Sequence, residues 1–237
     1  MSSAVRVAPS ALQGLSFFDG LDEPAVAEAA RMGRVRQLRK NERLFEQGVE
    51  ARAFHVLLRG HLKAVQTGNT GQRVVVRFLG PGEPAGVLAL LGADQRYPAS
   101  AFAVVDSVVL SWEGAALQGL LRCHPGIALS AMRAMGDRVH EAHARVGEMA
   151  AERVERRLAH ALLRLVRQAG PPGPGGVVRI DFPVGRQDIA DMAGTTLHTA
   201  SRVLSGWEQA GILEAGGRQR IVVRRPRALM RIADECA

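Results

Sequence analysis

The stretch "RQDIADMAGTTLHTASRVLSGWEQAGIL", residues 186–213, contains two helical periods separated by a glycine. Ile189 and Met192, with Ala193 beside them, fall on one face of a short first helix. Gly194 can take the left-handed conformation that a tight turn between two helices requires. Two threonines before the second helix are candidate N-caps, Thr195 and Thr196. The stretch therefore predicts a helix-turn-helix.

The second helix of this motif has an apolar stripe and a polar stripe on opposite sides. The apolar stripe follows the spacing i, i+3, i+4, i+7 and consists of Ala200, Val203, Leu204 and Trp207. The polar stripe follows the same spacing and consists of His198, Ser201, Arg202 and Ser205. Such a face fits the major groove of DNA, because arginine can grip guanine O6 and N7 while serine can meet a base edge or a phosphate. The alternative is a helical hairpin with a solvated polar face.

A basic β wing is predicted directly after the second helix. The stretch "GILEAGGRQRIVVRR", residues 211–225, is typical of a strand, a Gly-Gly turn and a second strand, with arginines near the tip that suit DNA phosphates. Helix, turn, helix and basic wing in this order are far more specific than any one of them alone. The predicted DNA-binding residues are Arg186, Thr195, Thr196, His198, Thr199, Ser201, Arg202, Ser205, Arg218 and Arg220.

Charge and composition agree with a polyanionic partner. The chain has 237 residues and a formal net charge of +8, and residues 151–237 carry 14 basic against nine acidic residues. The two cysteines, Cys123 and Cys236, are far apart, which argues against a disulfide framework, a thiolate zinc site and an iron-sulfur cluster. No apolar run approaches the roughly 18 residues that span a bilayer. We therefore expect a cytoplasmic protein without a membrane partner.

Upstream of the helix-turn-helix the chain predicts a β-rich domain and then helices. The segment "EPAVAEAARMGRVRQL", residues 23–38, has helical spacing, whereas residues 41–113 form short β-branched runs cut by glycine and proline turns. Many short strands indicate a small barrel or jelly roll. Within them "GPGEPAG", residues 80–86, lacks the spacing of a phosphate-binding loop and is expected to be a turn.

A heptad pattern follows the β-rich domain. Residues 125–149 carry apolar side chains at the spacing 4-3-4-3-4-3, namely Ala128, Met132, Met135, Val139, Ala142, Val146 and Met149. The stripe could pack on its own barrel, but this even period favours a partner helix, and hence a homodimer. A further amphipathic helix is predicted within residues 150–170 and is ended by "GPPGPGG", residues 170–176. The predicted domains are a β domain (1–124), a dimerisation helix (125–149) and a winged helix-turn-helix (150–237).

This α+β organisation, a β jelly-roll sensor followed by a dimerisation helix and a winged helix-turn-helix, resembles the Crp-Fnr superfamily of bacterial transcription factors. The segments "LSFFDGLDE" (15–23), "NERLFEQGVEARAFHVLLRGHLKAV" (41–65) and "FLGPGEPAG" (78–86) resemble the sensor domain of that family, whose β fold is like a cyclic-nucleotide-binding domain. The resemblance implies a homodimeric, allosterically controlled transcription regulator. Its partners would be a pseudo-palindromic operator in double-stranded DNA and RNA polymerase.

The recognition helix departs from the family at one position. Many relatives carry Glu-x-x-Ser-Arg, and the matching residues here are His198, Ser201 and Arg202. The resemblance implies that Ser201 contacts a thymine-rich edge and that Arg202 contacts guanine. Because histidine replaces the glutamate, the half-site is expected to differ from the one those relatives share.

The sensor domain also departs from the cyclic-nucleotide pattern, which resembles Gly-Glu-Leu followed by Arg-Ser-Ala. Here the matching stretches are "GVLAL" (86–90) and "RYPAS" (96–100), and they set Tyr97 and Pro98 at the Arg and Ser positions. Pro98 has no N–H to donate to a phosphate, and Arg96 aligns only after a register shift. Cyclic AMP (cAMP) is therefore disfavoured as the effector. The candidate effector pocket consists of Gly86, Val87, Leu88, Arg96, Tyr97, Pro98 and Ala99.

The segment "TTLHTASR", residues 195–202, resembles the helix-turn-helix of nitric-oxide-responsive denitrification regulators, which implies sensing through haem. Haem needs an axial ligand and an apolar slot. Spacing singles out none of the candidates His55, His61, His124, His140 and His143, of which His140 and His143 border the heptad stripe. A rival function is a ligand-binding module of the same β fold that acts on a protein partner rather than on DNA. An enzyme is disfavoured, because no nucleophile-base pair, carboxylate pair or metal triad stands at a usable spacing.

Overall fold

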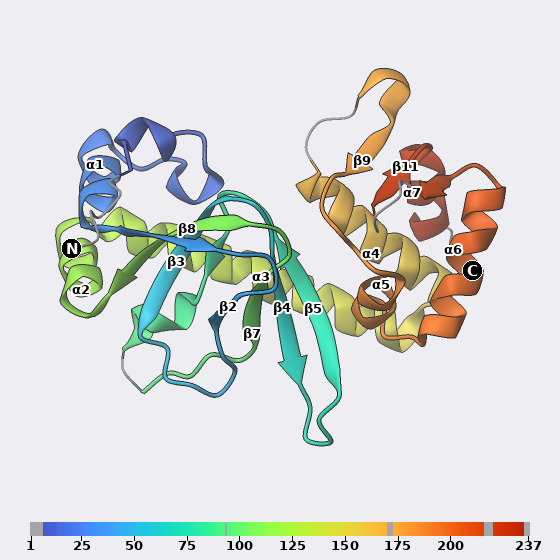
Figure 1. Ribbon diagram of the computed structural model, residues 1–237, viewed down its shortest axis with the longest axis horizontal. Coiled ribbons are helices and arrows are strands. Elements are labelled where there is room, and N and C mark those ends of the chain that lie inside the picture. The colour runs from blue at the N-terminus through green and yellow to red at the C-terminus, as the bar shows by residue number, and fades with distance from the viewer. Residues whose placement is uncertain (1–6, 93, 170–172, 216–219, 235–237) are drawn as a thin grey trace. The chain divides into compact units, whose positions relative to one another are not determined.

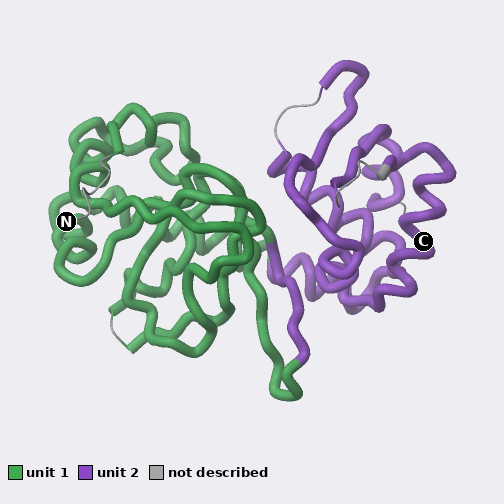
Figure 2. Tube along the Cα trace, in the orientation of Figure 1, with its two compact units in different colours: residues 1–71, 78–141 green, residues 72–77, 142–237 purple. Residues whose placement is uncertain are grey.

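The computed structural model describes residues 7–92, 94–169, 173–215 and 220–234. The chain divides into two compact units (Figure 2), the first made of residues 1–71 and 78–141 and the second of residues 72–77 and 142–237. One long helix, α3 (Pro125–Ala151), contributes residues to both units. The three-part division with boundaries after residues 124 and 149 stays a prediction.

The first unit is built on two four-stranded sheets with the strand orders β1-β8-β3-β6 and β2-β7-β4-β5 (Figure 1). The pairs β1–β8, β3–β8, β3–β6, β2–β7 and β4–β7 are antiparallel. The strands are β1 (Arg34–Leu38), β2 (Arg43–Phe45), β3 (Ala53–Arg59), β4 (Leu62–Thr67), β5 (Arg73–Leu79), β6 (Pro84–Ala85), β7 (Ser100–Ala103) and β8 (Ser107–Glu113). The predicted β jelly roll is thus confirmed, and residues 80–83 form the predicted turn, here between β5 and β6.

Alternation along the strands divides the core of this unit into two clusters. On β3, Phe54 and Val56 belong to a cluster with the helices α1 (Glu23–Met32), α2 (Gly114–Cys123) and the start of α3, whereas Leu57 belongs to a cluster that draws side chains from both sheets. The indole of Trp112 donates to the carbonyl of Ala29 at 3.0 Å and fixes α1 over β8. The short 3-10 turns are η1 (Pro9–Ala11), η2 (Ser16–Phe18) and η3 (Val87–Leu91).

The helix predicted over residues 23–38 is wrong in its second half. The helix α1 ends at Met32, and residues 34–38 form strand β1, which pairs with β8 from Arg34 opposite Ser111 to Leu38 opposite Ser107. At the break Gly33 has an extended backbone, with a φ of −73° and a ψ of 148°, and glycine is required there because a Cβ would lie 2.6 Å from the Leu110 side chain. Long-range pairing with β8 overrides the local helical spacing.

The second unit carries the predicted winged helix-turn-helix. Its helices are α4 (Val154–Gln168), α5 (Arg186–Met192), α6 (Leu197–Gln209) and α7 (Pro226–Asp234), with the 3-10 turn η4 (Pro174–Gly176). Its sheet has the order β10-β11-β9, from β9 (Val178–Ile180), β10 (Leu213–Ala215) and β11 (Ile221–Val223). The buried core includes Leu158, Leu162, Ile180, Phe182 and Ile189. In the part of the chain that the structure describes, no helix combines the length and hydropathy needed to cross a membrane.

Candidate functional site

The turn between α5 and α6 is built as the sequence predicts. Gly194 has a φ of +61°, the left-handed region that only glycine adopts without strain. A Cβ at this position would also lie 3.1 Å from Cε of Met149. Of the two candidate caps, Thr196 is the N-cap, and its Oγ1 accepts a hydrogen bond from the Thr199 amide at 3.2 Å. The glycine therefore sets the angle at which α6 leaves the turn.

The inner face of α6 is fixed by burial and by one side-chain hydrogen bond. Ala200, Leu204 and Trp207 are at most 4% exposed, whereas Val203 is half-buried. The Trp207 indole donates to Oε1 of Glu155 on α4 at 3.2 Å. Because α6 is held along this face, the opposite face has a defined orientation relative to α4.

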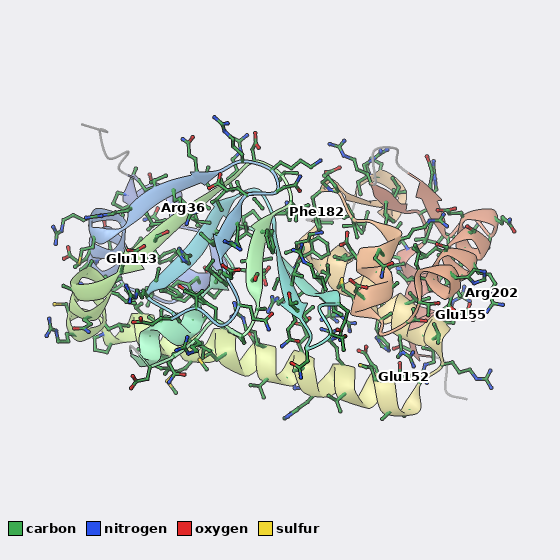
Figure 3. All side chains as sticks on the ribbon, turned by 60° about the horizontal axis from the view of Figure 1, so that its bottom comes forward. Arg36, Glu113, Glu152, Glu155, Phe182 and Arg202 are labelled. Carbon is green, nitrogen blue, oxygen red and sulfur yellow. The ribbon has the colours of Figure 1, made fainter. Side chains whose placement is uncertain are left out.

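The outer face of α6 is polar and cationic. His198 and Arg202 are exposed one helical turn apart, Thr196 is exposed before them, and Ser201 is half-buried beside them. Figure 3 shows Arg202 extending outward from α6. No described residue hydrogen-bonds or pairs with its guanidinium, which is therefore available to a base edge. Ser201 and Thr199 add hydroxyl groups to this face, while Thr195 is half-buried in the turn.

Arg186 and Ser205, both predicted to contact DNA, are engaged inside the motif. Nη1 of Arg186 donates to the Ser201 carbonyl at 3.1 Å and to Oγ of Ser205 at 2.9 Å. Its Nη2 lies 2.9 Å from both carboxylate oxygens of Glu208. Arg186 therefore clamps the first turn of α5 to the recognition helix. The spacing of polar residues on α6 could not predict these contacts, because Arg186 belongs to α5.

Two arginines outside the predicted DNA-binding set hold the carbonyl groups of the turn. Nη2 of Arg145 on α3 donates to the Met192 carbonyl at 3.2 Å. Nε of Arg157 on α4 donates to the Ala193 carbonyl at 2.9 Å, and its Nη2 donates to the Gly194 carbonyl at 3.3 Å. These bonds satisfy carbonyls at the end of α5 that have no helical partner. Spacing carries no signal for them, since the acceptors are backbone atoms 36 to 47 residues away.

The wing is present, but its tip is not described. Strands β10 and β11 pair antiparallel from Leu213 opposite Val223 to Ala215 opposite Ile221. Arg220 is exposed just before β11, where a phosphate could meet it, whereas Arg218 lies outside the described residues. Arg224, just after β11, forms an ion pair with Glu214.

The predicted dimer stripe on α3 is largely exposed. The large apolar side chains of Leu129, Met132, Val139, Val146 and Met149 are between 49% and 67% exposed, and Ala142 is exposed between them. Ala128 is half-buried, and Met135 packs partly against the core of the first unit. The open stripe therefore runs through Leu129 rather than through Met135. Residues near the start of α3 must serve both the sensor core and the exposed face.

The predicted effector pocket is filled by one of its own residues. Tyr97 is only 5% exposed, and its ring stacks on Phe45 with 4.0 Å between the ring centroids. The phenol donates to the Ala53 carbonyl at 2.9 Å and accepts from the Ala53 amide at 3.1 Å. Burial raises the pKa of this phenol. Tyr97 therefore fills the space that it was predicted to line.

The other predicted pocket residues surround this ring or point elsewhere. Gly86 has a φ of +71°, and a Cβ there would lie 3.0 Å from the Tyr97 ring. Arg96 is exposed, and its Nη1 donates to the Gly48 carbonyl at 2.7 Å. Val87 is buried in the helix-facing core, while Leu88 and Ala99 are half-buried and Pro98 is exposed.

The two candidate haem ligands beside the heptad stripe lie at the surface. His140 and His143 are both exposed on α3, whereas an axial ligand must lie in an apolar slot that receives the macrocycle. His55 is buried, and its Nδ1 lies 2.7 Å from Oγ of Ser111, opposite it in the β3–β8 ladder. Burial, assisted by the positive charge of Arg36, lowers the pKa of His55 to about 3. Within the described ranges, no group of three or more His, Cys, Asp or Glu side chains is placed to hold a metal ion.

Comparison with known proteins agrees with this architecture. Residues 35–124 match the cyclic nucleotide-binding domain, and residues 156–232 match the Crp-like helix-turn-helix domain. The chain is 30% identical to the cyclic AMP receptor protein of Thermus thermophilus over 205 aligned residues. The alignment covers 86% of this chain and 91% of that protein. It is 28% identical over 217 residues to the global nitrogen regulator of Synechocystis sp., covering 88% and 95%. The structure of FixK2 from Bradyrhizobium japonicum has a similar fold, with a TM-score of 0.73 and 23% identity over 86% of this chain and 99% of that one. The chain therefore belongs to the Crp-Fnr family of DNA-binding transcription regulators.

Proposed function

We propose that this protein is a homodimer that binds a pseudo-palindromic operator and places α6 of each copy in the major groove. The observation that carries this proposal is the exposed face of α6, on which His198 and Arg202 point away from a buried apolar stripe. Arg202 has the geometry to grip guanine O6 and N7 together, and Ser201 can meet a neighbouring base edge or a phosphate. The exposed Arg220 of the wing adds a phosphate contact.

The partner helix is supplied by a second copy of the chain. Five large apolar side chains stand exposed along α3 at the spacing 3-7-7-3, from Leu129 to Met149. Exposure of so many large apolar groups on one helix is unfavourable in water, and a second α3 covers them by knobs-into-holes packing. A two-fold dimer that reads successive major grooves holds its recognition helices about 34 Å apart, so that the operator is a pseudo-palindrome.

His198 distinguishes the half-site from that of related regulators. A glutamate accepts hydrogen bonds only, whereas an imidazole can donate to guanine or accept from cytosine or adenine. We expect selection from random duplexes to return one half-site for the wild-type protein and a different one for His198→Glu. The same half-site for both proteins would show that residue 198 does not read a base.

The test of DNA binding uses footprinting on genomic fragments and the dependence of affinity on salt. Binding that neutralises several phosphates weakens steeply with added salt. Arg202→Ala should weaken binding by about 1–3 kcal/mol, roughly 5- to 150-fold, and relax the preference at one base pair. Arg122→Ala is the matched control, because Arg122 is an exposed arginine on α2 and its loss changes the net charge equally.

Three outcomes would count against the proposal. The absence of any footprint, or an Arg202→Ala variant that binds as the wild type does, would contradict DNA readout by α6. Affinity for DNA that does not change with salt, together with stable capture of a protein, would favour the rival function of a module that regulates a protein partner.

Nitric oxide sensing through haem stays a prediction, as does RNA polymerase as a partner. His140 and His143 are exposed, so haem would need another of the candidate histidines as its axial ligand. Protein purified with haem available should show a Soret band that shifts under nitric oxide, and the absence of such a band would contradict haem sensing.

A further inference from the structure

The aromatic cluster in the sensor domain is a packed unit. Phe45 on β2 stacks with Tyr97 at 4.0 Å between centroids and 12° between planes, and with His55 on β3 at 5.8 Å and 18°. Rings from two strands and one loop thus fill the region beside Gly86. In that region the family's cyclic-nucleotide pattern places the residues that would hold a ligand.

Every polar group of Tyr97 has a partner. Its hydroxyl is bonded to both the amide and the carbonyl of Ala53. Its backbone amide donates to the Val49 carbonyl at 3.0 Å, and its carbonyl accepts from the Gly48 amide at 2.8 Å. The side chain is therefore anchored at both ends and does not fill the space loosely.

The groups that would bind a cyclic phosphate are held elsewhere or absent. The guanidinium of Arg96 is bonded to the Gly48 carbonyl, and Pro98 has no N–H. Gly86 leaves no room either, because even a Cβ there would lie 2.6 Å from the Ala53 carbonyl oxygen. A nucleotide could enter this region only after Tyr97 had left it.

The filled region is connected to α3 within the same unit. His55 of the cluster pairs with Ala85 on β6, the strand that precedes Gly86. The carbonyl of Pro84, on the same strand, accepts a hydrogen bond from Nη2 of Arg138 on α3. Arg138 precedes Val139 of the exposed stripe. The packing of the cluster can thus bias the position of the helix that the proposed dimer uses.

We propose that Tyr97 is a built-in occupant of the sensor domain, which takes the place of a small-molecule effector and keeps α3 in its DNA-binding arrangement. The consequence for regulation rests on the proposed function, whereas the occupancy itself does not. The protein then binds its operator without a cyclic nucleotide, and its activity is set by the amount of protein or by signals acting elsewhere.

The first experiment measures thermal unfolding and operator affinity of the wild-type protein with cAMP or cyclic GMP. A ligand that binds the folded state, present at about 100 times its Kd, raises Tm by several degrees. We expect no shift in Tm and no more than about a twofold change in operator affinity. A clear rise in Tm, or an operator affinity about tenfold higher with either nucleotide, would overturn the proposal.

The second experiment removes the occupant and then returns it. Tyr97→Gly deletes a side chain whose free equivalent is 4-methylphenol, so this compound can rebuild both the stack and the hydroxyl bonds. We expect operator binding about tenfold weaker in Tyr97→Gly, restored by 4-methylphenol and restored less by toluene, which lacks the hydroxyl. Tyr97→Phe is the control, because its ring leaves no cavity for either compound, and its operator affinity should not respond to them.

If Tyr97→Gly fails to fold, the conservative variant Tyr97→Phe still tests the proposal. Tyr97→Phe retains the ring, so we expect it to bind the operator and to ignore cyclic nucleotides as the wild type does. A folded Tyr97→Gly that binds the operator like the wild type without any added compound would refute the proposed role. Absence of operator binding by the wild type would instead refute the proposed function, and the Tm measurements would still test occupancy.

Discussion

Replacing Arg186 with alanine separates positioning of the recognition helix from contact with DNA. Its guanidinium joins α5 to three residues of α6, Ser201, Ser205 and Glu208. If the main role of Arg186 is to hold α6, its loss must lower the stability of the helix-turn-helix and weaken DNA binding together. If its main role is contact with a phosphate, only binding should fall.

The size of the stability effect follows from the exposure of the partners. The side chains of Arg186 and Glu208 are 38% and 31% exposed, so water screens their ion pair to at most about 1 kcal/mol. The hydrogen bonds to Ser201 and Ser205 add about 0.5–1.5 kcal/mol each before allowance for water that replaces them. We expect Arg186→Ala to lower the free energy of unfolding of the second unit by about 1–2 kcal/mol.

The assay is urea unfolding followed by the fluorescence of Trp207 in a Trp112→Phe background, so that one indole reports on the second unit. The exchange variant Arg186→Glu with Glu208→Arg should recover part of the lost stability, because it rebuilds the ion pair in reverse. Arg202→Ala is the control and should weaken DNA binding with unchanged stability. An Arg186→Ala variant of unchanged stability that no longer binds DNA would refute the positioning role.

Three further predictions concern the turn, the sensor and the stripe. Gly194→Ala should lower the free energy of unfolding by about 1–2 kcal/mol, because of its left-handed φ; thermal unfolding by circular dichroism that matches the wild type would contradict this. The pKa of His55 is lowered from its ordinary value of 6.5 to about 3 in the folded protein. Between pH 6.5 and pH 3, therefore, the unfolded chain binds a proton at His55 and the folded chain does not. Stability should therefore fall by about 1.5 kcal/mol from pH 6.5 to pH 5, and denaturant titrations should show this slope reduced in His55→Gln. Val139→Glu should shift sedimentation from dimer to monomer, and an unchanged dimer would exclude the stripe as the interface.

The helix-turn-helix could be predicted from sequence because its determinants are local. Gly194 supplies a backbone conformation, Thr196 supplies a cap, and Ala200, Leu204 and Trp207 supply an apolar period, all within fourteen residues. Each of these signals acts over a few residues, so it survives without knowledge of the rest of the chain. The exposed face of α6 then follows from the buried one.

The failures share a dependence on distant partners. The strand at residues 34–38 exists because β8 pairs with it, and no local period in that segment indicates a strand. The contacts of Arg186, Arg145 and Arg157 could not be predicted either, because their partners lie 15 to 47 residues away and include backbone carbonyls. An arginine in a basic protein is equally suited to a phosphate and to a carbonyl, and only packing decides between them.

The role of Tyr97 also depends on partners that are distant in the sequence. This residue stands where the cyclic-nucleotide pattern of the family has an arginine. A β roll that can hold a nucleotide must keep a space between its strands, and an empty space costs about 24 cal/mol per Å³. Loss of the phosphate-binding arginine alone would leave such a space without an occupant. A tyrosine at that position removes the charge and fills the space at once, provided that a flat ring can stack on it and a backbone amide and carbonyl can meet its hydroxyl. Phe45 and Ala53 meet these two conditions, so one residue both replaces the arginine of the cyclic-nucleotide pattern and fills the space beside Gly86.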